Sequence, residues 1–557
     1  MDEVEQELIK KTKEMIQDLK SVCANNGIGN TGNEYKIITQ VFLYKFLNDK
    51  FLYEVGKKMP QYKGLSIKEI ESKILELNNN DYTELLMPLS ASTAKFKREH
   101  LISYLYNRKN LHDGNIEGVK EKEFYQLFDN VLEDLSNFNI DIFSVRTGSE
   151  EKIKLFDNLS NNIIESNKKN SFCRSIIDKL INFSFEGAFN EKYDFFSTIF
   201  EFLIKDYNKD FGKYAEYYTP NSIARIIAQI LVGNTQPQNV TVYDPSAGSG
   251  TLLLALAHQI GEDNCSLYTQ DISQKSNEFL RLNLILNNLV HSLDNVVHGD
   301  TLVNPAHYNK EHTRLKQFDF IVSNPPFKTD FSDTRDQIDG DKNKDRFFAG
   351  VPSVPNKKKD SMAIYLCFIQ HILYSLKDDG KAAIVVPTGF LTAQSGIEKK
   401  IRSRIIDNKW LKGVISMPSN IFANTGTNVS VLFIDKSNQA DEVLLVDASN
   451  LGEKVKEDKN QKTVLRKNEI TKIVNTFNNK ESVDDFSVLV SFEEIAEKNY
   501  SFSAGQYFEI KIEYIEMTQE EFNNKINYYK NELNELFEKN QKLEKEISSN
   551  LERLKYE

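Results

Sequence analysis

The residues best suited to chemistry form the short segment Asn324-Pro325-Pro326-Phe327, which follows the apolar run Phe320-Ile321-Val322. Two consecutive prolines fix the backbone and remove two N–H donors, so the segment presents rigid carbonyl oxygens. The Asn324 side-chain oxygen and the Pro325 carbonyl could each accept one N–H of a planar amine. This would draw the nitrogen toward tetrahedral geometry and free its lone pair for attack, while Phe327 stacks on the ring that carries the amine. The alternative is a structural Pro-Pro turn, and the residues upstream favour the chemical interpretation.

Acidic residues upstream follow three successive apolar segments, at the points where strands would end. Asp244 opens the Gly-rich turn Asp244-Pro245-Ser246-Ala247-Gly248-Ser249-Gly250, and Asp271 and Asp300 follow the next two apolar segments. Strands of a doubly wound sheet bind nucleotides at their carboxyl ends, and glycines let a ligand approach the backbone closely. Asp271 could accept two ribose hydroxyls side by side, and Asp300 could accept a hydrogen bond from an adenine amino group. Together these acids outline a nucleoside pocket, and the turn lacks the Lys-Ser/Thr ending of a triphosphate-binding loop.

The elements around these residues alternate between short apolar strands and helices, which predicts an α/β fold with a doubly wound, mostly parallel sheet. Expected strands cover 240–243, 267–269, 296–297, 318–322, 382–386, 410–417 and 429–434, the last a candidate for antiparallel pairing; expected helices cover 251–260, 273–287 and 361–376. Thr219 is expected to cap a further helix that begins at Pro220 and runs to about residue 231. Residues 328–360 lack periodicity and are rich in Asp and Lys, which is typical of a functional or mobile loop.

The rest of the chain divides into three further parts, so the predicted domains are 1–172, 173–440, 441–516 and 517–557. The first is expected to be helical, with a broad apolar stripe over 37–47. In the last, Thr518 and Glu521 form a capping box, and apolar residues from Phe522 to Leu554 follow heptad spacing. Such a coiled-coil seam needs another helix, either from the chain's own N-terminal region or from another subunit, and the pattern leaves both open.

Composition excludes several classes of protein. The chain has 557 residues, a net charge of −11 and 40% apolar residues, and its four cysteines stand far apart. These values are typical of an ordinary globular protein and favour neither a disulfide framework nor a metal site. The sequence lacks an apolar run long enough for a membrane span and begins with acidic residues, so we expect a cytoplasmic location and no membrane partner. The negative charge argues against coating nucleic acid by bulk attraction, although a local basic groove stays possible.

The Gly-rich turn followed by Asn-Pro-Pro-Phe resembles the S-adenosylmethionine-dependent amino-methyltransferases of DNA. In addition, Glu216-Tyr217-Tyr218-Thr219-Pro220 and the segment from Phe42 to Phe51 resemble signatures of the methylation (M) subunits of type I restriction-modification systems. The resemblance covers most of the chain and is specific from Tyr214 to Phe327. It implies a Rossmann-like methyltransferase domain that transfers a methyl group from S-adenosyl-L-methionine to the N6 amino group of adenine in a specific DNA sequence.

The same resemblance implies a role for each matching residue. Asp244 would lie near the amino group of the cofactor, Asp271 would hold its ribose and Asp300 its adenine, and Asn324, Pro325, Pro326 and Phe327 would form the catalytic loop. The methionine part would be cradled by Glu216, Tyr217, Tyr218, Thr219, Pro220, Asn221, Ser246, Ala247 and Gly248. Glu216 stands where these subunits more often have Gln, and Asn221 replaces a frequent Arg. The implied reaction is direct displacement on an adenine that is flipped out of the duplex.

Similar Asn-Pro-Pro-aromatic loops also serve enzymes that methylate glutamine side chains or RNA adenines. The chain is about twice as long as the former and shows no RNA-binding module, and cytosine N4 enzymes more often carry Ser in place of Asn324, so DNA adenine is favoured. About 120 residues follow the catalytic region, which leaves little room for DNA recognition. The expected partners are therefore double-stranded DNA, a specificity (S) subunit, a second M subunit and restriction (R) subunits. A solitary adenine methyltransferase and a catalytically inert structural subunit are the alternatives.

Overall fold

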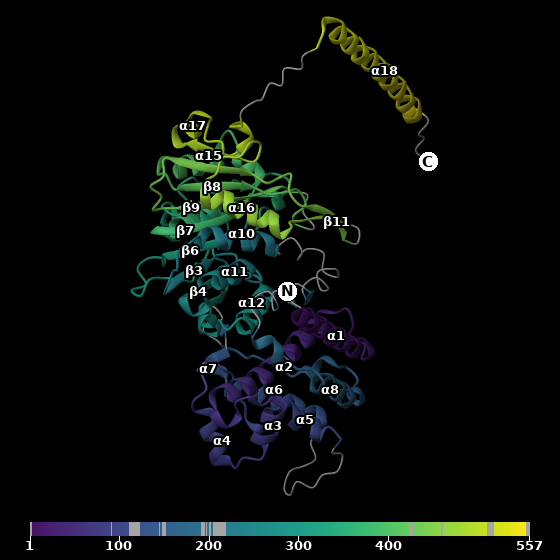
Figure 1. The fold of residues 1–557 in the computed structure, drawn as a ribbon, viewed down its shortest axis with the longest axis vertical. Coiled ribbons are helices and arrows are strands. Elements are labelled where there is room, and N and C mark those ends of the chain that lie inside the picture. The colour runs from purple at the N-terminus through teal and green to yellow at the C-terminus, as the bar shows by residue number, and fades with distance from the viewer. Residues whose placement is uncertain are drawn as a thin grey trace. The chain divides into compact units, whose positions relative to one another are not determined.

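The computed structural model describes residues 3–90, 92–110, 123–143, 145–146, 152–190, 195, 198–199, 202–203, 219–422, 427–457, 460–508 and 517–552. The chain separates into two compact units, Met1–Tyr507 and Phe508–Glu557, and Figure 1 labels many of their helices and strands. Within the described residues, every helix is either too short or too polar to cross a membrane.

The N-terminal part of the first unit is helical, as predicted. Its helices are α1 (Glu3–Asn25), α2 (Gly32–Lys58), α3 (Ile67–Leu75), α4 (Asn79–Leu86), α5 (Ile102–Arg108), α6 (Phe124–Phe138), α7 (Ile140–Phe143) and α8 (Ser166–Ile181). The apolar stripe predicted over 37–47 lies in α2 and is almost entirely buried there, because α1, α3 and η4 (Glu186–Asn190) all pack against this helix. Residue 172, the predicted domain boundary, falls inside α8.

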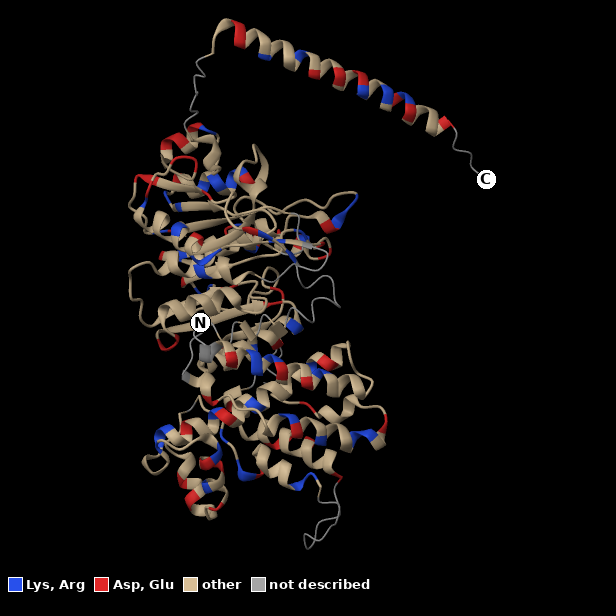
Figure 2. Ribbon diagram, turned by 45° about the vertical axis from the view of Figure 1, so that its right-hand side comes forward, with Lys and Arg blue, Asp and Glu red and all other residues tan. Residues whose placement is uncertain are grey.

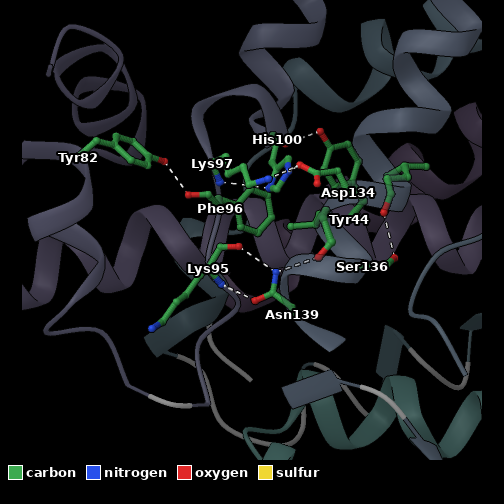
Figure 3. Close-up of polar contacts among 11 residues, drawn as sticks. Tyr44, Tyr82, Lys95, Phe96, Lys97, His100, Asp134, Ser136 and Asn139 are labelled. Carbon is green, nitrogen blue, oxygen red and sulfur yellow. Dashed lines mark hydrogen bonds and ion pairs between the residues drawn. The ribbon is translucent and has the colours of Figure 1, made fainter. Parts of the chain in front are cut away.

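A buried polar network holds this helical part together around the irregular segment 95–100 (Figure 3). The Tyr44 hydroxyl of α2 donates to a backbone carbonyl of this segment over 2.6 Å, and the Tyr82 hydroxyl of α4 donates to another over 2.9 Å. The Asn139 amide, just after α6, both accepts from and donates to the Lys95 backbone. Buried backbone groups that lack a partner in a helix or sheet need such hydrogen bonds, which here come from side chains of α2, of α4 and of the residue after α6.

An eleven-stranded sheet forms the second part of the same unit, with the order β13-β10-β8-β9-β7-β6-β3-β4-β5-β1-β2. Its strands are β1 (Val145–Arg146), β2 (Lys152–Ile153), β3 (Val240–Asp244), β4 (Cys265–Asp271), β5 (Val296–His298), β6 (Phe318–Ser323), β7 (Leu376–Pro387), β8 (Leu411–Ser416), β9 (Val429–Asp435), β10 (Glu442–Asp447) and β13 (Ser487–Ser491). Strands β5, β4, β3, β6 and β7 run parallel, and β9 is antiparallel to β7 and β8. The predicted doubly wound sheet and its antiparallel strand are confirmed.

The helices of this part are α10 (Asn221–Val232), α11 (Thr251–Ile260), α12 (Gln274–Leu286), α14 (Tyr365–Ser375), α15 (Gly396–Asp407), α16 (Lys467–Asn479) and α17 (Phe492–Glu497). The helix expected over 361–376 begins four residues later than predicted, after the short turn η9 (Lys359–Ser361). Strands β1, β2, β10 and β13 were not predicted, and the last two bring residues of the segment 441–516 into the sheet. A separate hairpin joins β11 (Glu453–Glu457) and β12 (Asn460–Val464). The four-part domain division stays a prediction.

Contacts between α12 and the N-terminal region join the helical part to the sheet. Arg281 of α12 is 9% exposed, and its guanidinium donates to the backbone carbonyls of Lys154 and Phe143. The Tyr35 ring of α2 lies 4.7 Å from the Phe279 ring, centroid to centroid, and β1 extends the sheet beside β5. The helix that follows Asp271 is therefore fixed by the helical part.

The segment 328–360 has a small hydrophobic core of its own. It contains α13 (Arg335–Ile338), and its apolar side chains pack on α14 and on Leu302, which follows β5. The buried members of this core are Leu302, Phe331, Ile338, Phe347, Val351, Met362, Ile364, Cys367 and Phe368. Arg346, 4% exposed, donates from Nη2 to the Leu302 carbonyl. The segment is thus anchored beside the turn that carries Asp300.

The second unit contains the long helix α18 (Gln519–Glu552). The predicted capping box is present, because Glu521 accepts from the Thr518 backbone N–H at 2.9 Å and the Glu521 N–H donates to the Thr518 hydroxyl at 3.2 Å. Charges of both signs alternate along the helix (Figure 2), and no described residue of it is buried. Its apolar side chains are about half exposed or more, among them Phe522, Leu533 and Leu536. Leu554, the last predicted seam position, lies outside the described residues.

Candidate active site

Parallel strands bring the predicted polar residues to one edge of the sheet. Asp244 and Asp271 end β3 and β4, Asp300 lies two residues after β5, and Asn324 follows β6. The register pairs Asp244 with Thr269 and Asp271 with His298, so the carboxyl ends of these strands lie side by side. These side chains therefore meet at the carboxyl ends of the strands, where doubly wound sheets bind their ligands.

The Gly-rich turn connects β3 to α11 through two left-handed residues. Gly250 has φ +83°, and a Cβ atom there would lie 2.3 Å from Leu280 Cδ1. Gly248 has φ +52°, and its N–H donates to Asp271 Oδ2 over 2.8 Å. Side chains strain such a backbone. Glycine is thus required at 250, where the turn lies against Leu280 of α12, and the turn is tied to the carboxylate at the end of the next strand.

Asp244 is the most buried acid at this edge, with 2% exposure. Its Oδ1 accepts from the Ser246 N–H at 2.9 Å, and the Ser246 hydroxyl lies 2.7 Å from the hydroxyl of Ser323, the last residue of β6. Burial raises the pKa of Asp244 to about 7, against the opposing effect of these hydrogen bonds, and the nearby Asp271 raises it slightly further. The carboxyl group is therefore poised to ionise when a cation arrives.

The Asp271 carboxylate accepts hydrogen bonds from two backbone N–H groups. Besides the Gly248 N–H on Oδ2, its Oδ1 accepts from the Ser273 N–H over 2.8 Å. Burial raises the pKa of this carboxyl group, partly offset by the two amides. Each carboxylate oxygen has two acceptor sites, so one site on each oxygen stays available for a ribose hydroxyl.

Asp300 opens a tight turn after β5. Its Oδ1 accepts from the Leu302 and Val303 N–H groups at 2.9 and 3.1 Å, while Oδ2 has no partner among the described residues. The neighbouring Thr301 hydroxyl donates to the Pro245 carbonyl over 2.7 Å. One oxygen of Asp300 thus positions the turn and the other can accept a ligand N–H.

Asn324 is oriented by a residue from the upstream motif. Its Nδ2 donates to the Thr219 hydroxyl over 3.1 Å, which leaves its Oδ1 as an acceptor. The prediction that Thr219 caps the following helix is wrong: α10 begins at Asn221, and Pro220 occupies the N-cap position without a side-chain hydrogen bond. The Thr219 hydroxyl is engaged by Asn324 instead, so it is drawn toward the sheet edge rather than toward the helix.

The rest of the catalytic loop lies against aromatic rings. Pro325 is buried, and Pro326 and Phe327 are half-buried. The Phe327 ring meets the Tyr365 ring edge to face, with 6.3 Å between centroids, and Tyr365 meets Phe390 in the same way at 6.2 Å. Edge-to-face rings of this kind hold one another in place. Phe327 is therefore supported from α14 and leaves part of its surface exposed.

Three predicted site residues, Glu216, Tyr217 and Tyr218, lie outside the described residues.

Two further residues are candidates for a functional role that the sequence did not indicate. Ser323 links Asp244's turn to the catalytic loop, and its signal was its place directly before Asn324. Ile272 is 69% exposed directly after Asp271, and an apolar residue there could have been noted as a surface for a flat ring.

The doubly wound fold and the polar residues at the carboxyl edge of its sheet assign this chain to the class of methyltransferases. The family model described as N-6 DNA Methylase matches residues 191–514. The methylase subunit of the type I restriction enzyme MpnII from Mycoplasma pneumoniae is 33% identical over 342 residues, which span 60% of this chain and 60% of that relative. The MjaIX methylase subunit from Methanocaldococcus jannaschii is 26% identical over 509 residues, 87% of this chain and 84% of that relative.

A solved structure supports the same fold. The crystal structure of the methyltransferase subunit of a type I restriction-modification system from Streptococcus thermophilus aligns with a TM-score of 0.68 at 22% identity, covering 91% of this chain and 100% of that one. The chain belongs to the N-6 DNA methylase family. The predicted class, an adenine-specific DNA methyltransferase of the type I methylation-subunit kind, is confirmed, as is the predicted fold.

Proposed function

We propose that this chain is the modification subunit of a type I restriction-modification complex in the cytoplasm. It transfers a methyl group from S-adenosylmethionine to the N6 amino group of adenine in a specific DNA sequence. The observation that carries the proposal is the meeting of three acidic side chains and the oriented Asn324 amide at one edge of the sheet.

The residues at this edge fit S-adenosylmethionine, which when bound supplies a methyl group activated by a sulfonium charge. Asp244 would face the cationic amino group, because its raised pKa leaves it ready to ionise beside a cation. Asp271 would accept the ribose hydroxyls, and the unpartnered Asp300 Oδ2 would accept from the adenine amine. Ile272 would cover one face of the adenine. Thr219, Pro220, Asn221, Ser246, Ala247 and Gly248 would line the methionine part, together with Glu216, Tyr217 and Tyr218.

Asn324 and Pro325 would hold the target amine. With Nδ2 engaged by Thr219, the Asn324 Oδ1 can accept one N–H of the adenine amino group and the Pro325 carbonyl the other. Two fixed acceptors orient the nitrogen lone pair and cost no reorganisation during the reaction. The proton can leave after alkylation, so no dedicated base is needed.

The target adenine has to leave the duplex before it reaches this loop, at a cost of a few kcal/mol. Phe327 offers a partly exposed ring, held by Tyr365, on which the extruded base would stack. Stacking on an aromatic side chain is worth about 1–3 kcal/mol per base, which offsets much of that cost.

Sequence recognition would come from a separate specificity subunit. The apolar seam of α18, exposed and flanked by charges of both signs, is suited to a coiled coil with helices of that partner. A second copy of this chain and nuclease subunits would complete the complex. The acidic balance of the chain agrees with a partner that supplies much of the DNA contact.

The test is methylation of duplex DNA with tritiated cofactor, with and without the co-expressed specificity partner. We expect the tritiated methyl group to be incorporated at adenine N6 only when both chains are present. Incorporation by this chain alone would make it a solitary enzyme, and no incorporation in either case would make it an inert scaffold.

A further inference from the structure

A second cleft opens at the opposite edge of the sheet from Asn324. It has a volume of about 240 Å³ and is lined by Arg314, Arg404, Lys436, Trp410, Tyr374 and Phe348, among others. Gln317, also in its wall, and Asn324 flank the six-residue strand β6. At about 3.3 Å per residue, the strand keeps the two sites roughly 20 Å apart. The cleft is therefore separate from the methyl-transfer site.

The cleft is cationic in a chain whose net charge is −11. Three of its lining side chains are cations and one, Asp345, is a carboxylate. The guanidinium of Arg314 has no hydrogen-bond or ion-pair partner among the described residues, and that of Arg404 has only the ring of Phe348. Burial lowers the pKa of Lys436, the nearby Asp378 opposes this effect, and Arg404 adds slightly to it, so an anion between Arg404 and Lys436 would relieve the repulsion of the two cations.

The cations are arranged so that their donors stay available. The Arg404 guanidinium lies over the Phe348 ring, 4.5 Å from its centroid, and the Lys436 ammonium lies 4.9 Å from the Trp410 centroid. Stacking uses the face of a guanidinium and leaves its in-plane N–H groups free for bidentate contact with phosphate. Lys436 also donates to the Leu376 carbonyl over 2.9 Å, which fixes its position.

The wall behind these groups is rigid. Gln370 is fully buried and uses its amide to bind the backbone of Ala349 and Gly350, which follow Phe348. Arg346, which follows the lining residue Asp345, is buried with Nε and Nη1 unpaired among the described residues, and its Nη2 donates to the Leu302 carbonyl. The hydrogen bonds of Gln370 therefore fix the backbone beside Phe348, the ring on which Arg404 stacks.

We propose that this cleft binds a nucleoside phosphate, with Arg314 and Arg404 on the phosphate and the base against Trp410 and Tyr374. Cationic side chains beside aromatic rings suit a nucleotide, whether it is free or part of a strand, because the cations attract the phosphate and the rings stack on the base. Pockets that bury most of a ligand commonly measure about 300–1,000 Å³, and this cleft measures about 240 Å³, so part of a bound nucleotide would stay exposed to solvent. The inference is independent of the proposed function.

Binding in this cleft can be followed by intrinsic fluorescence, because Trp410 is the only tryptophan of the chain. The full-length protein would be titrated with adenosine monophosphate while saturating S-adenosylhomocysteine fills the cofactor site. We expect saturable quenching of the tryptophan fluorescence. Adenosine alone and inorganic phosphate alone should each bind at least about tenfold more weakly, because each makes half of the contacts. A single-stranded oligonucleotide that quenches more tightly than the free nucleotide would identify a nucleic-acid strand as the source of the ligand.

Variants separate this cleft from the cofactor site. The double variant Arg314→Ala, Arg404→Ala should weaken binding by about tenfold or more, whereas Lys399→Ala on the same helix α15, outside the cleft, and Asp300→Ala should leave it unchanged. Circular dichroism checks that each variant is folded. The proposal is overturned if none of the nucleotide probes quenches Trp410, if phosphate alone binds as well as the nucleotide, or if Asp300→Ala rather than the double variant removes binding.

Discussion

The Asn324 amide donates to the Thr219 hydroxyl over 3.1 Å, although 105 residues separate the two in the chain. This hydrogen bond connects the segment before α10 with the loop after β6. Because an amide that donates from Nδ2 to a fixed acceptor turns its Oδ1 to the other side, Thr219 decides which atom of Asn324 faces a bound base. Thr219 therefore has a positioning role that its place beside Pro220 does not suggest.

Thr219→Val tests this positioning role. Valine has the same shape and lacks the hydroxyl, so Asn324 loses its fixed orientation and methyl transfer should fall about tenfold, the value of one hydrogen bond. Thr219→Ser restores the hydroxyl and should recover most of the rate. Single-turnover methylation measures the effect, and an unchanged rate in the valine variant would contradict the role.

The affinity for the cofactor should depend on pH through Asp244. Its pKa is raised to about 7, so the group is ionised above that value and neutral below it. Because only the carboxylate attracts a cationic amino group, affinity is full near pH 8 and should fall about tenfold by about pH 6. Calorimetry of cofactor binding follows this change. Asp244→Asn should bind weakly and with little pH dependence over this range, and a wild-type affinity that stays flat would argue against the assignment.

Gly250→Ala should destabilise the first unit. The substitution places a side chain at φ +83° and a Cβ atom 2.3 Å from Leu280 Cδ1, so the free energy of unfolding should fall by about 2–4 kcal/mol. Gly389→Ala is the matched control, because a Cβ there has no neighbour within 4 Å. Its cost should stay below about 1 kcal/mol. Urea unfolding compares the two variants, and equal stabilities would show that the contact of this turn with Leu280 tolerates a methyl group.

The exposed seam of α18 should be needed for partner binding but not for cofactor binding by the first unit. Leu533→Glu and Leu536→Glu place charges on the seam, so co-purification with the specificity partner should be lost, while Asn534→Glu on the polar face adds the same charge without effect. Deletion of residues 518–557 should also release the partner and leave calorimetric cofactor binding intact. Retention of the partner by the truncated chain would place the contact elsewhere.

Local chemistry allowed much of this fold to be predicted. Helix α11 covers the predicted residues 251–260, because a Gly-rich turn before an apolar run marks its start. The strands from β3 to β9 were predicted, since these buried strands read as continuous apolar runs, whereas the two-residue strands β1 and β2 were not. The strands β10 and β13 follow the same pattern but lie beyond a charged stretch that resembles the end of a domain.

Long-range contacts account for what the sequence did not reveal. Thr219 beside a proline is typical of a helix cap, and only the folded chain brings its hydroxyl to Asn324. The segment 328–360 lacks periodicity because Phe331, Phe347 and Val351 pack individually on α14 and Leu302 rather than along one element. Arg346 likewise reads as a surface charge until the fold buries it.

The most direct test of the account is Asn324→Ala, assayed in the assembled complex for methyl transfer and by calorimetry for cofactor affinity. We expect transfer to adenine N6 to be lost, because the amine loses a fixed acceptor, while the cofactor binds as it does to the wild-type chain. Transfer that continues at the wild-type rate, or cofactor binding that disappears together with transfer, would contradict the role given to Asn324.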